Sequence, residues 1–152
     1  MIQNPAARML TAAADHIQRV GIYQGDGHLW QPEQMGDVAP CTPLHAFETG
    51  VRAVRPNRFN PEPDVWDAFQ AAIVRALTTV SDHVNGTPIR PERWEQLQMS
   101  EYGIRRSVLW LWGDEPGRTT EDTAAAFREA AELAKCDVHH VEATVLRTKN
   151  LV

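Results

Sequence analysis

Four stretches of this chain place apolar residues at the three- and four-residue spacing of a helix face, and prolines and glycines separate them. Such spacing over ten or more residues predicts amphipathic helices. We expect helices over about residues 5–20, from about Thr42, over about 64–81, and from Thr119 or Thr120 to about Lys135. Three prolines between residues 55 and 63 prevent one helix from running through that segment. A chain patterned in this way folds mainly as packed helices.

The predicted helices also carry end signals. Asn4, Thr42 and Asp64 each precede or open an apolar stripe, and their side-chain oxygens can accept from the free amides of a first turn. Gly21 and Gly86 follow two of the stripes, where glycine commonly ends a helix. We expect the stripe of 64–81 to belong to the central helix of the core, so that Ile73→Asp abolishes cooperative folding. Its apolar positions are Val65, Phe69, Ala72, Ile73, Ala76, Leu77 and Val80.

The remaining segments give weaker signals. Ser107–Trp112 is apolar without a clear period, and its valine and tryptophan content favours a strand. Alternation at Val141, Ala143 and Val145 predicts a second strand over Val138–Leu146. We also expect a short hairpin from residues 22–23 and 28–30, and a two-turn helix over 91–97. The predicted fold is a mainly α, compact bundle of about four helices with a small two-stranded β element near the C-terminus.

Length and charge limit the classes of function. At 152 residues we expect one globular domain over 1–152, with its core at about 5–135 and a C-terminal extension over 136–152. The formal net charge of −5 argues against nucleic-acid binding, which depends on basic contacts to phosphates. We see no secretory signal and no apolar run long enough to span a membrane, so we expect a cytoplasmic protein. No spacing typical of a metal or cofactor site occurs, and none is predicted.

Cys41 is the candidate for covalent chemistry. It precedes a predicted helix, where the helix dipole lowers a thiol pKa, and His45 follows one turn later. A cysteine paired with a histidine can act as a nucleophile, with Asp114 as a further weak candidate. Cysteine is also among the most buried residue types, so a packed, inert Cys41 is the plainer interpretation.

Arg118 and the tryptophans are candidates for binding. Asp114 and Arg118 bracket a Pro-Gly turn before the last helix, where Arg118 could hold a small anion or simply pair with Asp114. Tryptophan is enriched at interface hot spots, and the chain has five. We weigh interface and core equally for Trp30 and Trp94, and assign Trp110 to the core.

Three segments together resemble a known family. They are the Ala-rich helix that leads into Gln24-Gly25, the mid-chain Cys41 at a helix start, and the turn from Trp112 to Thr119 that reads Trp-x-Asp-x-Pro-Gly-Arg-Thr. This order resembles an uncharacterised family of actinobacteria and their phages, known only as a domain of unknown function. The resemblance covers most of residues 7–135, except 55–63 and 87–104. It implies a helix-rich fold in a bacterial cytoplasm and supplies no activity.

The residues favour a non-enzymatic protein that acts by binding a partner protein or by self-association. Three features support this expectation: the absence of a recognisable catalytic constellation, the number of tryptophans and the long loops with proline and glycine. The alternatives are a cysteine-dependent enzyme that uses Cys41 with a histidine, and a regulator that binds a small anion at Arg118.

Overall fold

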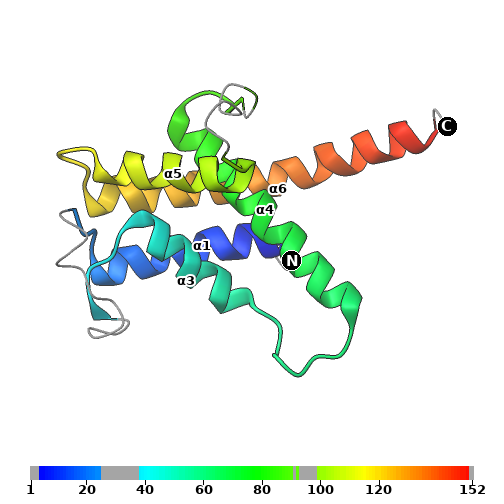
Figure 1. The fold of residues 1–152 in the computed structure, drawn as a ribbon, viewed down its shortest axis with the longest axis horizontal. Helices are drawn as coiled ribbons and strands as arrows, with labels where there is room; N and C mark the ends of the chain where they lie inside the picture. Colours follow the sequence, from blue (N-terminus) through cyan, green and yellow to red (C-terminus); the bar gives the residue numbers. More distant parts are fainter. Residues whose placement is uncertain (1–3, 25–37, 91, 93–98, 151–152) are drawn as a thin grey trace.

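The fold is mainly helical, as predicted. The computed structural model describes residues 4–24, 38–90, 92 and 99–150, with the backbone alone for 136–150. Within these residues the chain forms five α-helices in place of the expected four (Figure 1): α1 (Pro5–Val20), α3 (Pro43–Val54), α4 (Pro63–Asn85), α5 (Glu101–Asp114) and α6 (Thr120–Asn150).

Both ends of α1 follow the signals in the sequence. The Asn4 side chain accepts from the Ala7 amide at 2.9 Å, and Pro5 occupies the first helical position, where no amide donor is needed. Gly21 ends the helix at a φ of 89°, and its amide donates to the Ile17 carbonyl. The bounds predicted for this helix are confirmed.

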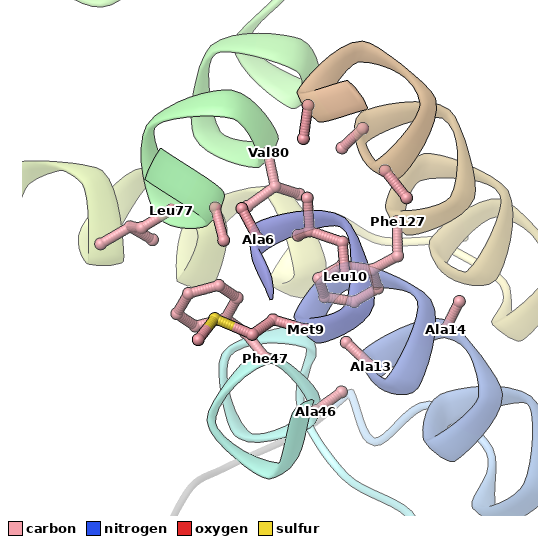
Figure 2. Close-up of a cluster of buried hydrophobic side chains, with 14 of the residues drawn as sticks. Ala6, Met9, Leu10, Ala13, Ala14, Ala46, Phe47, Leu77, Val80 and Phe127 are labelled. Carbon is pink, nitrogen blue, oxygen red and sulfur yellow. The ribbon is translucent and has the colours of Figure 1, made fainter. Parts of the chain in front are cut away.

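Helix α1 forms the centre of the core, where residues 64–81 were expected. It buries 8 of its 16 residues, whereas α4 buries 7 of 23. Helices α3, α4 and α6 all pack against α1. Figure 2 shows Met9 and Leu10 among side chains of these three neighbours, which include Phe47, Val80 and Phe127. Ile73 of the predicted stripe is only half-buried. The centre of the core therefore lies on α1 and not on α4, which carries that stripe.

A glycine allows α1 and α3 to cross closely. A Cβ atom at Gly50 would lie 2.1 Å from the Met9 carbonyl oxygen and 3.2 Å from the Ala13 Cβ. A backbone atom cannot move aside as a flexible side chain can, so only glycine fits at this contact. Gly113 plays a similar part at the end of α5, where an added Cβ would lie 2.4 Å from the Pro43 Cγ.

The predicted β element is wrong. Ser107–Trp112 lies within α5, and Val138–Leu146 lies within α6, which continues past the predicted end at Lys135. A short apolar run fits the period of a strand and that of a helix. For Ser107–Trp112 the helix start at Ser100 favours the helix, since the Ser100 hydroxyl accepts from the Gly103 amide at 3.0 Å. The one bridge found among the described residues is an isolated parallel pair between Ile22 and Cys41.

The starts of the later helices differ slightly from expectation. Thr42 caps α3 as predicted, with its side chain accepting from the His45 amide at 3.2 Å. Helix α4 begins at Pro63, so Asp64 lies in the first turn and no side chain caps the helix. Thr119 and Asp122 bond reciprocally to each other's amide at the start of α6. The predicted hairpin strand at 28–30 and most of the 91–97 helix lie outside the described residues.

A buried arginine attaches α5 to α4. Arg105 is 6% exposed, and its guanidinium donates to the Asp82 carboxylate at 2.7 Å, the Ser81 hydroxyl at 3.0 Å and Glu101 at 3.1 Å. Asp82 in turn accepts from the Ile89 amide at 2.8 Å. A buried charge with several partners fixes the orientation of the elements that supply them. Helix α5 is therefore held to the bundle on this side by polar contacts.

Candidate functional site

The Cys41 thiol is closed to solvent. Cys41 is 1% exposed. Its backbone pairs with the segment after α1: the Cys41 amide donates to the Gly21 carbonyl, and the Cys41 carbonyl accepts from the Tyr23 amide. Burial raises the pKa of this thiol from 9.0 to about 12. The thiolate is the nucleophilic form, so at neutral pH Cys41 remains a protonated, packed side chain. This conformation does not support the cysteine-dependent enzyme.

His45 lies beside another histidine. The His45 ring centroid is 6.5 Å from that of His16, with the planes tilted by 54°. His16 is 3% exposed, and its Nδ1 lies 3.1 Å from the Arg19 guanidinium. His16 was not predicted as part of a site, and its position on the apolar face of α1 is the only sequence signal for its burial. The two rings form a contact between α1 and α3.

Arg118 is engaged within its own turn. Its guanidinium lies 3.9 Å from the centroid of the Trp112 ring and donates from Nε to the Trp112 carbonyl at 3.1 Å. Its Nη2 pairs with Glu115 at 2.5 Å, rather than with Asp114 as expected. Asp114 is the exposed last residue of α5. These contacts use the guanidinium to shape the turn between α5 and α6.

Gln24 also stabilises the turn between α5 and α6. Its amide donates to the Gly113 carbonyl at 3.0 Å and to the Glu115 carbonyl at 2.6 Å. The end of α5 has carbonyls without helical partners, and Gln24 donates to one of them, that of Gly113. The Glu115 carbonyl follows the helix and also accepts from the Arg118 amide. Gln24 thus contacts the Trp-x-Asp-x-Pro-Gly-Arg-Thr motif at Gly113 and Glu115, and these contacts stabilise the end of a helix.

A shallow depression lies beside this turn. It encloses about 330 Å³ between α4, α5 and α6, and its charged lining residues are His83, Arg118, Asp122 and Glu129. His83 pairs with Glu129 at 2.7 Å, and Asp122 accepts from the Thr119 amide. Two carboxylates, Asp122 and Glu129, line the depression beside the one arginine, whose guanidinium is already bonded within its turn, so the depression carries no excess positive charge for an anion.

Neither metal-ligand groups nor membrane-spanning helices occur among the described residues. Across these residues, no group of three or more His, Cys, Asp or Glu side chains is placed to hold a metal ion. None of the described helices combines the length and the apolar character that crossing a bilayer requires. Of the predicted binding residues, Trp30 and Trp94 lie outside the described residues.

Helix α5 leaves three large side chains exposed, Tyr102, Trp110 and Leu111, with the half-buried Arg106 beside Tyr102; we call these four residues the α5 outer face. Tyr102 is 43%, Trp110 39% and Leu111 67% exposed. Arg106 lies over the Tyr102 ring at 5.5 Å and pairs with Glu48 of α3 at 2.8 Å. Trp110 was assigned to the core, and that prediction is wrong. The spacing of Tyr102, Arg106 and Trp110 by four residues is a helical signal that treating 107–112 as a strand concealed.

These features define an α-helical bundle protein that exposes apolar side chains on one firmly held helix and keeps its mid-chain cysteine buried. The chain belongs to DUF6197, a family of unknown function, which matches residues 1–133. No curated protein and no solved structure matches it. The family resemblance seen in the sequence is thus confirmed for a family of unknown function. The match ends at residue 133, within α6.

Proposed function

We propose that this protein is a non-enzymatic interaction protein that binds a partner protein through the α5 outer face. Following the family resemblance in the sequence, we place it in the cytoplasm of actinobacteria or of the hosts of their phages. The observation that carries the proposal is the exposure of the consecutive residues Trp110 and Leu111 on a helix that Arg105 attaches to α4.

The composition of this face suits protein recognition. Tryptophan, tyrosine and arginine are the residue types most enriched at interface hot spots, and all three occur here within nine consecutive positions, Tyr102–Trp110. Tyr102 and Trp110 lie about 12 Å apart along the helix axis, a length that a partner helix or groove can cover. Trp110 and Leu111 therefore offer a partner two large exposed apolar side chains at one end of α5.

The support of α5 favours binding without rearrangement. Arg105 holds one side to α4, and Gly113 lies against Pro43 of α3 at the far end. A side chain on a rigid element loses less conformational freedom when it is bound. The alternatives have less support, because the Cys41 thiol is buried and protonated and the Arg118 guanidinium is used within its turn.

Affinity capture with a matched pair of variants tests the proposal. The face variant combines Trp110→Gln and Leu111→Gln, and glutamine keeps a high helix propensity. The control variant combines Phe59→Gln and Val74→Gln, which are 76% and 57% exposed away from α5. Wild-type protein, face variant and control variant are immobilised in parallel and exposed to an actinobacterial lysate. We expect proteins that the wild type and the control retain and that the face variant loses by at least about tenfold.

Binding is then measured with the purified captured protein. A dissociation constant that rises at least about tenfold for the face variant and stays near wild type for the control would support the α5 outer face. If all three proteins retain the same set, or if the two variants lose it equally, this face is not the binding surface.

A further inference from the structure

Helix α5 lies at an edge of the bundle. It packs mainly against α4 and α3, whereas α1 lies among three neighbouring helices (Figure 1). Its side chains at Tyr102, Trp110 and Leu111 remain open to solvent. A second molecule can therefore reach α5 without displacing another described helix.

One stripe of α5 carries opposite charges on either side of a tryptophan. Arg106, Trp110 and Asp114 follow one another by four residues within the helix, so their side chains leave it on the same side. Arg106 lies about 6 Å before Trp110 along the helix axis, and Asp114 lies about 6 Å after it. The order of the stripe is thus positive, aromatic, negative, and its reverse has the complementary order.

A second copy of α5 matches this stripe when it runs antiparallel. When Trp110 is level with the partner's Trp110, a residue four positions before it is level with the residue four positions after it on the other copy. Arg106 of each copy is then level with the partner's Asp114, and two-fold symmetry repeats this opposite-charge pair. Helices that pack through rows of residues four apart cross at about −50°, which brings two such rows into contact.

Both charged groups can take part in this contact. Asp114 is exposed, and its carboxylate has no ion-pair partner among the described residues. Arg106 pairs with Glu48 through Nη2 at 2.8 Å, and a guanidinium carries five N–H donors. Arg106 can therefore serve Glu48 and a carboxylate from a second copy together. The Glu48 pair also restrains the arginine, so that less side-chain freedom is lost on association.

The mixed sign of the stripe indicates which partner fits. A uniformly acidic partner would meet a like charge at Asp114, and a uniformly basic partner would meet one at Arg106. A second copy supplies both signs in the matching order. It also brings a second Trp110 to the centre, and tryptophan rings pair favourably in offset or edge-to-face arrangements.

We propose that two copies of this chain associate through an antiparallel pairing of α5 about Trp110. Each Arg106 faces the partner's Asp114, and the two Trp110 side chains meet at the two-fold axis. This inference rests on the proposed function, because it names a molecule that occupies the α5 outer face. A partner protein that binds this face then competes with the second copy. One helix from each copy forms a small contact, so the dimer is weak and depends on concentration.

Sedimentation velocity of the full chain over a range of concentrations tests the pairing. Asp114→Arg sets like charges level with each other twice in each dimer. The matched control, Asp67→Arg, reverses another exposed carboxylate near the start of α4 and changes the net charge equally. We expect a concentration-dependent dimer for the wild type and the control, and a dissociation constant at least about tenfold weaker for Asp114→Arg. A wild type that stays monomeric, or equal weakening by both variants, would overturn the proposal.

A mixture of two variants tests the register. The second variant combines Arg106→Glu with Glu48→Arg, which keeps the ion pair within the chain and exchanges its signs. Mixed with Asp114→Arg, it forms one contact with the native charges and one with the charges exchanged. We expect the equimolar mixture to dimerise at least about tenfold more tightly than either variant alone. A mixture no tighter than its components would exclude this register. Circular dichroism checks that each variant keeps the folded bundle.

Competition separates this inference from the proposed function. We expect the purified captured protein to replace the second copy, so that the dimer gives way to complexes with one copy each. Binding of the captured protein to the intact dimer would overturn the pairing, since the face would then be uncovered. A monomeric wild type that still binds this protein overturns the pairing alone. A dimer that passes the charge tests while no protein is captured contradicts the proposed function alone.

Discussion

Helices α1 and α5 are similar in length but are held in different ways. Helix α1 is surrounded by three other helices, and apolar side chains such as Met9 and Leu10 fill its contacts. Helix α5 buries Ile104 and Leu109 and is also attached to α4 by Arg105, but it leaves Tyr102, Trp110 and Leu111 exposed. Helix α1 thus stabilises the fold, whereas α5 presents large side chains to solvent. Substitution of a buried residue of α1 should therefore lower stability, whereas substitution of an exposed residue of α5 should weaken binding and leave stability nearly unchanged.

The largest effect is expected from Leu10→Ala in α1. Leu10 is fully buried, and its truncation leaves a cavity among side chains of α4 and α6. We expect the free energy of unfolding to fall by about 2–5 kcal/mol, measured by denaturant titration. The matched substitution in α5, Leu111→Ala, should change it by no more than about 0.5 kcal/mol, since Leu111 is 67% exposed. Equal losses in the two variants would contradict the distinction between the helices.

A second comparison uses two helical glycines. At Gly50 an added Cβ meets the backbone of α1 at 2.1 Å, so Gly50→Ala should cost about 1–3 kcal/mol or more as the helices are pushed apart. At Gly103 of α5 the nearest atom is the Ser100 hydroxyl oxygen at 3.2 Å. Gly103→Ala should fall within about 1 kcal/mol of wild type, because alanine favours the helix while the cap adjusts. If Gly50→Ala proves as mild, α1 and α3 do not cross as closely as the structure shows.

The buried thiol predicts a smaller effect that depends on pH. Burial raises the pKa of Cys41 to about 12, so between about pH 9 and that value the unfolded chain loses a proton that the folded protein keeps. The unfolded state is favoured as the pH rises, and stability declines over this range. Cys41→Ala removes this contribution. The stability advantage of wild type over Cys41→Ala should therefore shrink from about pH 8 to about pH 11. A constant difference would show that the thiol is open to solvent.

Much of the helical architecture was predictable from local signals. The cap at Asn4, the glycine at position 21 and the stripe between them define α1 without any tertiary information. The choice of central helix was not predictable, because α1 and residues 64–81 carry similar apolar stripes and only packing selects between them. The prediction of a strand over residues 107–112 was wrong for a related reason. A short apolar run fits a strand or a helix, and the contacts that accompany the helix lie outside the run: the cap at Ser100 and the ion pair of Arg105 with the distant Asp82.

The candidate site was less predictable than the fold. Exposure and burial of particular side chains depend on which helices meet, so Trp110 was assigned to the core and Cys41 remained open to two interpretations. The turn around Arg118 was located correctly, but its partner is Glu115 in place of Asp114. Sequence spacing places a residue on a helix face. It does not indicate whether another helix covers that face.

The most direct test of this account is the stability of the variant that combines Trp110→Gln and Leu111→Gln. Trp110 and Leu111 keep 39% and 67% of their surface exposed, which predicts a cooperative denaturant transition and a loss of stability smaller than that of a core truncation. The side chains would then be free to bind a partner. A loss of more than about 2 kcal/mol, comparable to that of a core truncation, would show that these residues stabilise the fold and would contradict the proposed binding face.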